Sequence, residues 1–142
     1  MAQVNRLYPD TYEQVWDGTG GIAAGAYLLS NEIDNAAGLW QGMYVYVRLD
    51  FFIAPADSWL HVAIIEAVDG TNYEDAVTTT YQQKVVASIR YTSDTAQKHG
   101  FHVPRIPPCK FKLRFHNSDA VRTVLGTSEA GILLYTTELA AS

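Results

Sequence analysis

Two segments of this chain alternate between apolar and polar side chains, and this period of two constrains the fold more than any other feature. From Met43 to Ile53 every odd position is apolar, while the even positions mix tyrosine, arginine, aspartate and phenylalanine. Lys110–His116 alternates more cleanly, with Phe111, Leu113 and Phe115 between basic residues. Because successive side chains of a strand point to opposite faces, each segment predicts a β-strand with one face on a core.

Further segments have the apolar, β-branched and aromatic composition of strands: Tyr27–Ile33, Leu60–Val68, Lys84–Tyr91, Phe101–Val103 and Ile132–Thr137. Turn residues such as Asp69-Gly70 separate them, and Pro107-Pro108 cannot donate ladder hydrogen bonds. Strands with so little helical spacing predict an all-β fold, an antiparallel two-sheet sandwich of the jelly-roll type over residues 26–142. Its core is expected to include Val45, Val47, Leu49, Phe51, Leu113 and Phe115.

The first 25 residues show no steady period. They combine Tyr8, Tyr12 and Trp16 with a proline, several glycines and polar residues. We predict an irregular N-terminal arm over residues 1–25, whose aromatic side chains bind another surface, because a free tail would not be expected to carry them. A chain that begins at Ala26 is then expected to keep its melting temperature. The alternative, an arm that packs on its own domain, fits the sequence equally well.

The chain carries no motif that predicts catalysis. Cys109 is the only cysteine, which excludes an intramolecular disulfide and a thiolate-rich metal site. His99 and His102 are three residues apart, but Gly100 and Pro104 predict a loop or strand, in which the two side chains diverge. No Gly-x-Ser-x-Gly elbow and no phosphate-binding glycine loop occurs. We therefore expect a protein that is not an enzyme, with no catalytic residues, no cofactor and no bound metal.

Charge and hydropathy limit the kinds of partner that we expect this chain to bind. Ten basic and fifteen acidic side chains give a formal net charge of −5, which argues against nucleic acid as a partner. The apolar runs are far shorter than the roughly 20 residues that span a bilayer, so no membrane partner is expected.

Two features point to binding of another macromolecule. Nine tyrosines and three tryptophans supply the residue types enriched at interfaces. The basic residues of the segment from Lys110 project from one strand face, which suits an acidic partner surface; a solvated sheet face or protection of a sheet edge is the alternative. The candidate partner-binding residues are Tyr8, Tyr12, Trp16, Lys110, Lys112 and Arg114.

The order of segments AYLLSNEID, GMYVYVRLDFF, DGTNYED, IPPCKFKLRFHN and GILLYTTEL, between Ala26 and Leu139, resembles the small jelly-roll cement (decoration) proteins of tailed double-stranded DNA phages, of the Bordetella phage type. The resemblance implies a protein that binds the outer surface of the head and stabilises contacts between capsomers. It implies the major capsid protein as partner, a homodimer or homotrimer, and a place on the virion exterior after synthesis in the host cytoplasm.

A carbohydrate-binding β-sandwich module or phage adhesin domain is the alternative function, since sandwiches can present stacked aromatic side chains to sugars. The three tryptophans Trp16, Trp40 and Trp59 discriminate between the two functions. Exposed and coplanar indoles would favour sugar binding, whereas buried ones would favour the decoration protein.

Overall fold

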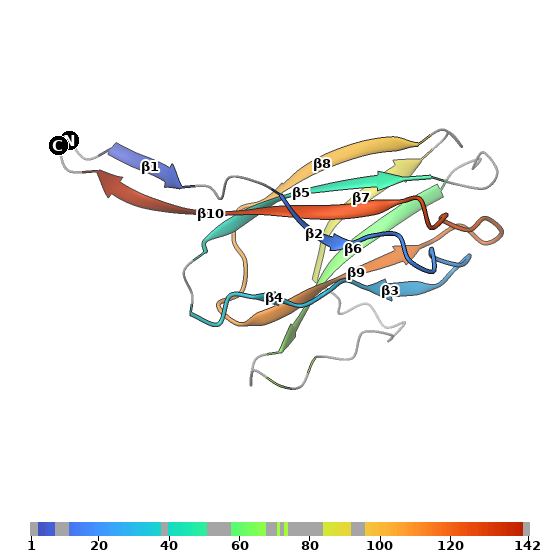
Figure 1. The fold of residues 1–142 in the computed structure, drawn as a ribbon, viewed down its shortest axis with the longest axis horizontal. Helices are drawn as coiled ribbons and strands as arrows, with labels where there is room; N and C mark the ends of the chain where they lie inside the picture. The colour runs from blue at the N-terminus through green and yellow to red at the C-terminus, as the bar shows by residue number, and fades with distance from the viewer. Residues whose placement is uncertain are drawn as a thin grey trace.

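A computed structural model describes residues 3–7, 12–37, 40–50, 58–67, 71, 73, 84–91 and 96–140. Two antiparallel sheets pack face to face (Figure 1). The first sheet contains β1 (Gln3–Leu7), β2 (Glu13–Trp16), β5 (Gly42–Leu49), β8 (Gln97–Val103) and β10 (Glu129–Ala140). The second contains β3 (Tyr27–Leu29), β4 (Ile33–Asp34), β6 (Ser58–Ala67), β7 (Lys84–Tyr91) and β9 (Lys110–Asn117).

The strand order is that of a jelly roll. The first sheet runs β2, β10, β5, β8, and the second runs β3 with β4, then β9, β6 and β7. Every described pair is antiparallel, and only β6 and β7 are neighbours both in the chain and in a sheet. Most connections lead from a strand of one sheet to a strand of the other sheet. Paired strands are therefore distant in sequence, as in other jelly rolls. The predicted fold class is confirmed.

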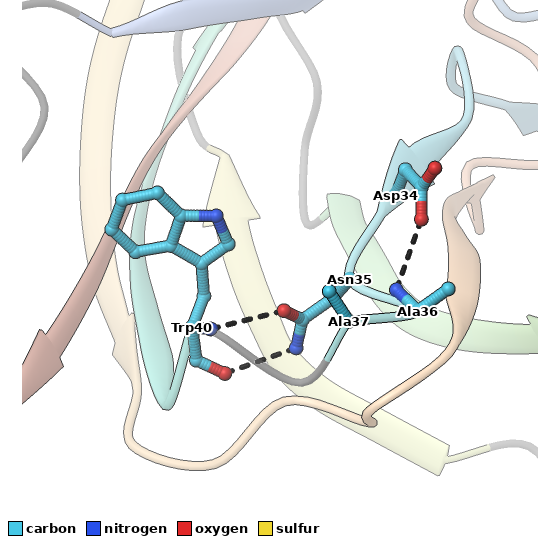
Figure 2. A pocket seen from close by; sticks show the side chains of 5 residues that line it. All are labelled: Asp34, Asn35, Ala36, Ala37 and Trp40. Atoms are coloured by element: carbon cyan, nitrogen blue, oxygen red, sulfur yellow. Dashed lines mark hydrogen bonds between the residues drawn. The ribbon is translucent and has the colours of Figure 1, made fainter.

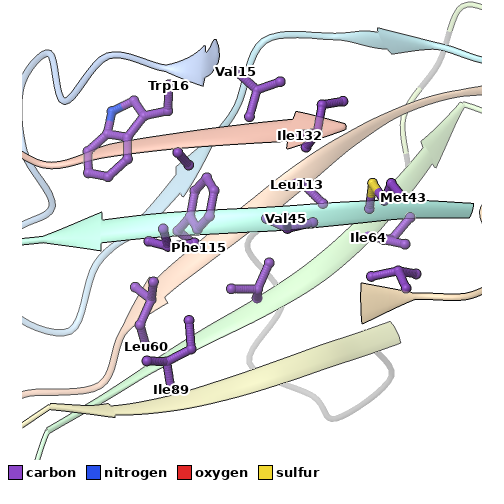
Figure 3. Close-up of a cluster of buried hydrophobic side chains, with 14 of the residues drawn as sticks. Val15, Trp16, Met43, Val45, Leu60, Ile64, Ile89, Leu113, Phe115 and Ile132 are labelled. Atoms are coloured by element: carbon purple, nitrogen blue, oxygen red, sulfur yellow. The ribbon is translucent and has the colours of Figure 1, made fainter. Parts of the chain in front are cut away.

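The core lies between the inner faces of the two sheets (Figure 3). The apolar positions of the two alternating segments supply much of it, because each strand turns that face inward. Five of the six predicted core residues are at most 1% exposed: Val45, Val47, Leu49, Leu113 and Phe115. The sixth, Phe51, lies outside the described residues.

Residues 13–22, which were predicted to belong to an arm, are part of the sandwich. β2 pairs with β10, with Trp16 opposite Ala130. Val15, Trp16 and Ile22 are buried in the core. The prediction of an arm is therefore wrong for these residues, and the alternative of packing on the same domain holds. A strand of four residues is too short to establish a period in the sequence.

A two-stranded ribbon extends beyond the sandwich. β1 pairs with the last five residues of β10, from Leu7 opposite Thr136 to Gln3 opposite Ala140. β5 pairs with the other edge of β10 only as far as Tyr135. Among the described residues, that edge of β10 is therefore unpaired over residues 136–140. We call Gln3–Leu7 and residues 136–140 the terminal ribbon; Figure 1 shows it projecting from the two sheets.

Candidate functional site

The six residues predicted to bind a partner do not come together. Tyr8 lies outside the described residues. Trp16 is buried, with its ring 5.6 Å from that of Phe115. Tyr12 lies on the outer face of the first sheet, against Tyr46. The three basic residues of β9 lie on the outer face of the second sheet, on the opposite side of the sandwich.

The lysines of β9 are engaged within the chain. Lys110 Nζ lies 3.8 Å from a carboxylate oxygen of Glu32. Lys112 Nζ lies 4.6 Å from the centre of the Tyr73 ring, and the Tyr73 hydroxyl donates a hydrogen bond to Glu32. Both interactions are local to this face, so the lysines are not the free row of cations that an acidic partner surface would need.

One line of side chains runs across the outer face of the second sheet, with one residue on each of four strands. Tyr27, His116, His61 and Ser88 face one another in register on β3, β9, β6 and β7. The His61 Nδ1 and Ser88 Oγ atoms are 2.8 Å apart. Burial lowers the pKa of each histidine, and the charge of Arg114 lowers it further.

Arg114, the third basic residue of β9, is also engaged within the chain. Its guanidinium lies over the Tyr27 ring, 4.7 Å from the ring centre, and the residue is 4% exposed.

The outer face of the first sheet carries a cluster of aromatic side chains that we call the tyrosine face: Tyr12, Tyr44, Tyr46, His102 and Tyr135. Tyr12 meets Tyr46 edge to face, with ring centroids 5.1 Å apart, and is 48% exposed. Tyr44 stacks on His102, with centroids 4.5 Å apart and planes 17° apart. The Tyr135 hydroxyl is hydrogen-bonded to His102 Nε2. Pairing of β2, β10, β5 and β8 brings together residues from four distant segments.

A groove of about 340 Å³ opens in the tyrosine face beside the edge strand β8. Its lining residues are Tyr12, Tyr44, Val45, Gly100, Phe101 and His102. Tyr46 of β5 lies between Gly100 on β8 and Gly131 on β10 in the strand register, and its ring covers Gly131. A Cβ atom built on Gly131 would lie 2.4 Å from Tyr46 Cε1. The Tyr46 ring therefore leaves the surface above Gly100 open.

A second hollow, of about 390 Å³, lies beside the loop between β4 and β5 (Figure 2). Asn35 is buried there, and its amide binds the loop backbone. Its Oδ1 accepts a hydrogen bond from the Trp40 N–H, and its Nδ2 donates to the carbonyl oxygens of Trp40 and Pro107, each at 3.0 Å. Asp34 accepts from the Ala36 N–H at 2.9 Å. These bonds join Asn35 to Trp40 and Pro107 and give the amide a structural role.

The three tryptophans do not form a platform. Trp16 is in the core, and Trp40 is partly buried against it. Trp59 is 37% exposed on the second sheet, with its ring parallel to that of His61 and the centroids 6.5 Å apart. A sugar site built from three exposed coplanar indoles is therefore excluded by their positions.

Within the described ranges, no three His, Cys, Asp or Glu residues gather as a group that could hold a metal ion. No helix in this part of the chain is long and apolar enough to cross a membrane.

Sequence reasoning missed Tyr44, Tyr46 and His102 as surface residues. The available signal was the even positions of the segment from Met43, which carry tyrosines on the face away from the core. Gly100 in the interior of a strand was a second signal, because glycine weakens a strand unless its position requires a bare backbone.

No protein family matches this sequence, and no functionally curated protein matches it. Solved structures overlap it at low identity, including the following three. A carbohydrate-binding module CBM36 in complex with calcium and xylotriose overlaps at a TM-score of 0.45 and 10% identity, over 96% of this chain and 99% of that one. The CBM22-1–GH10 modules of Clostridium thermocellum xylanase 10B, complexed with xylohexaose, overlap at a TM-score of 0.49 and 11% identity, over 98% of this chain and 27% of that one. A chain in the structure of infectious bursal disease virus Gt strain overlaps at a TM-score of 0.44 and 16% identity, over 96% of this chain and 33% of that one. These TM-scores are low, and the assignment of the sandwich rests on the strand pairing itself.

Proposed function

We propose that this chain is a non-enzymatic decoration protein that binds the outer surface of a phage head, with the major capsid protein as its partner. It would stabilise contacts between capsomers from the virion exterior, after synthesis in the host cytoplasm. The observation that carries this proposal is the terminal ribbon, which extends beyond the sandwich with one edge of β10 unpaired among the described residues.

The ribbon needs a second surface for its stability. A two-stranded ribbon is at best marginally stable in water. Its open edge, over residues 136–140, presents backbone N–H and C=O groups that can pair with another strand. Addition of a strand to such an edge is a common mode of protein recognition, in which main-chain hydrogen bonds supply affinity. A capsid strand is the partner that we propose for this edge.

The jelly-roll body suits the same role. Its core is closed by long strands on both sheets, so it can act as a rigid support for the ribbon. A dimer or trimer of the chain would engage several capsomers at once. Each further contact would then be intramolecular, which raises the overall affinity without stronger individual contacts.

A variant that lacks residues 1–7 tests this function. Removal of β1 leaves β2 and the described core in place, so the variant and the full chain are both expected to unfold cooperatively. In co-sedimentation with heads that lack the protein, the full chain is expected to bind saturably, and the variant at least about tenfold more weakly.

The surface variant Val121→Ala is the matched control, because Val121 is 75% exposed on a loop of the sandwich; it should bind like the full chain. Equal binding of the variant without residues 1–7 would exclude the ribbon as the contact. Failure of the full chain to bind any head would contradict the proposed function.

A further inference from the structure

Gly100 occupies a strand position where the fold does not require glycine. It lies in the middle of β8, and its φ is outside the left-handed region. Among the described residues, a Cβ atom built on Gly100 meets only the carbonyl oxygen of Val45, at 3.7 Å, which is an ordinary contact. Glycine weakens a strand interior, and it often marks a site where a ligand approaches the backbone closely.

The groove above Gly100 has a definite chemistry. Tyr12 and the stacked pair of Tyr44 and His102 supply ring surfaces. His102 Nε2 is bonded to the Tyr135 hydroxyl, so the Tyr12 hydroxyl and His102 Nδ1 are the side-chain groups that can donate or accept a hydrogen bond to a ligand. The six lining residues include no carboxylate, ammonium or guanidinium group, and the nearby Lys98 ammonium lies over the Tyr46 ring, 4.7 Å from its centre. A ligand matched to this lining is uncharged, with an apolar face for the rings and hydroxyl groups along its rim.

We propose that this groove binds a neutral sugar ring of a glycan, with the ring lying over Gly100. A pyranose has the required combination of an apolar C–H face and a rim of hydroxyls. The groove volume of about 340 Å³ is within the range of small-ligand sites, which begin at roughly 300 Å³. The site lies on the tyrosine face and uses no residue of the terminal ribbon, so it is a function separate from attachment to a head.

Gly100→Val is the variant that tests the site. The Cβ atom of this residue meets only the Val45 carbonyl oxygen, at 3.7 Å, among the described residues, and valine favours strands, so the fold is expected to be kept. The same side chain occupies the floor on which the sugar would lie. The probes are cellohexaose, maltohexaose, laminarihexaose and chitohexaose, each titrated at up to millimolar concentration by calorimetry and by NMR shifts of the Gly100 and His102 amides.

At least one of these oligosaccharides is expected to bind the full chain, and G100V is expected to weaken that binding at least about tenfold. Tyr12→Ala, which removes one side chain that lines the groove, should weaken binding of the same oligosaccharide. Val85→Ala, on the outer face of the second sheet, is the control and should leave binding unchanged.

The absence of binding by all four oligosaccharides would overturn the inference, as would binding that is equal in G100V and the full chain. Binding of an extended neutral peptide such as hexathreonine, lost in G100V while the sugars do not bind, would assign the groove to a peptide instead. G100V should still co-sediment with heads, so failure of this site and failure of the proposed decoration role are distinguishable.

Discussion

Tyr27 on β3 stacks face to face on His116 of β9, with ring centroids 4.2 Å apart and ring planes 11° apart. His116 in turn faces His61 on β6, with centroids 5.8 Å apart. Burial lowers the pKa of both histidines, and for His116 the neighbouring His61 and Arg114 lower it further. The row is therefore most stable when both imidazoles are neutral.

This row predicts a loss of stability in mild acid. Because the pKa of each histidine is lower in the folded than in the unfolded chain, the unfolded state binds protons first as the pH falls. The stabilising contribution is complete above the ordinary histidine pKa of 6.5 and is lost as the pH falls through the lowered values. Urea unfolding near pH 7.5 and near pH 5.5 measures the difference. The double variant His61→Gln/His116→Gln should show a smaller difference than the full chain and than V121A; an unchanged difference would exclude the row as its source.

Truncation at Ala26 is expected to prevent folding. It removes β2 together with the buried side chains of Val15, Trp16 and Ile22. Loss of one buried large aromatic side chain costs about 3–5 kcal/mol, against a total stability of roughly 5–15 kcal/mol for a domain. Circular dichroism and urea unfolding should show no cooperative transition for this truncation. The variant without residues 1–7 is the control and should retain a transition; a normal transition in both would mean that the N-terminal segment adds nothing to the core.

Asn35→Ala is expected to loosen the loop between β4 and β5. The buried amide makes three hydrogen bonds, to backbone groups of Trp40 and Pro107. Their loss leaves buried polar groups unsatisfied, at a cost of about 1–3 kcal/mol per group. Chemical denaturation should show a lower unfolding midpoint for N35A. Asn31→Ala, at an exposed position four residues earlier, should unfold like the parent; equal midpoints for both variants would remove the structural role given to Asn35.

Gly18 and Gly20 provide a matched pair in the connection after β2. Both have positive φ, 87° and 79°. A Cβ atom on Gly18 would lie 2.1 Å from the Ser128 carbonyl oxygen, whereas one on Gly20 meets nothing within 4 Å among the described residues. Gly18→Ala is therefore expected to destabilise the protein by about 1–3 kcal/mol more than Gly20→Ala, which carries only the conformational cost. Equal losses in thermal unfolding would show that the Gly18 contact relaxes.

The fold could be predicted from the sequence where strands are long enough to show their period. The segments from Met43 and from Lys110 each alternate over at least seven residues, and each forms a strand with the expected face buried. β2 has four residues, so its burial of Val15 and Trp16 depends on pairing with β10, far away in sequence.

The surface sites were harder to predict from the sequence than the fold, because they depend on tertiary structure. Three basic residues on one face of β9 were correctly placed on that face, but their neighbours Glu32, Tyr73 and Tyr27 come from other segments. Spacing along a strand cannot reveal such partners. The tyrosine face likewise forms only when β10 and β8 pair with β5.

The central claim is that this chain stabilises a phage head from its outer surface. The most direct measurement compares the heat resistance of heads that lack the protein with that of the same heads after saturation with it. A ligand that binds only the assembled state stabilises that state by mass action. We predict a higher disruption temperature for the saturated heads, and no such increase with the variant that lacks residues 1–7. Disruption of bare and saturated heads at the same temperature would contradict the claim.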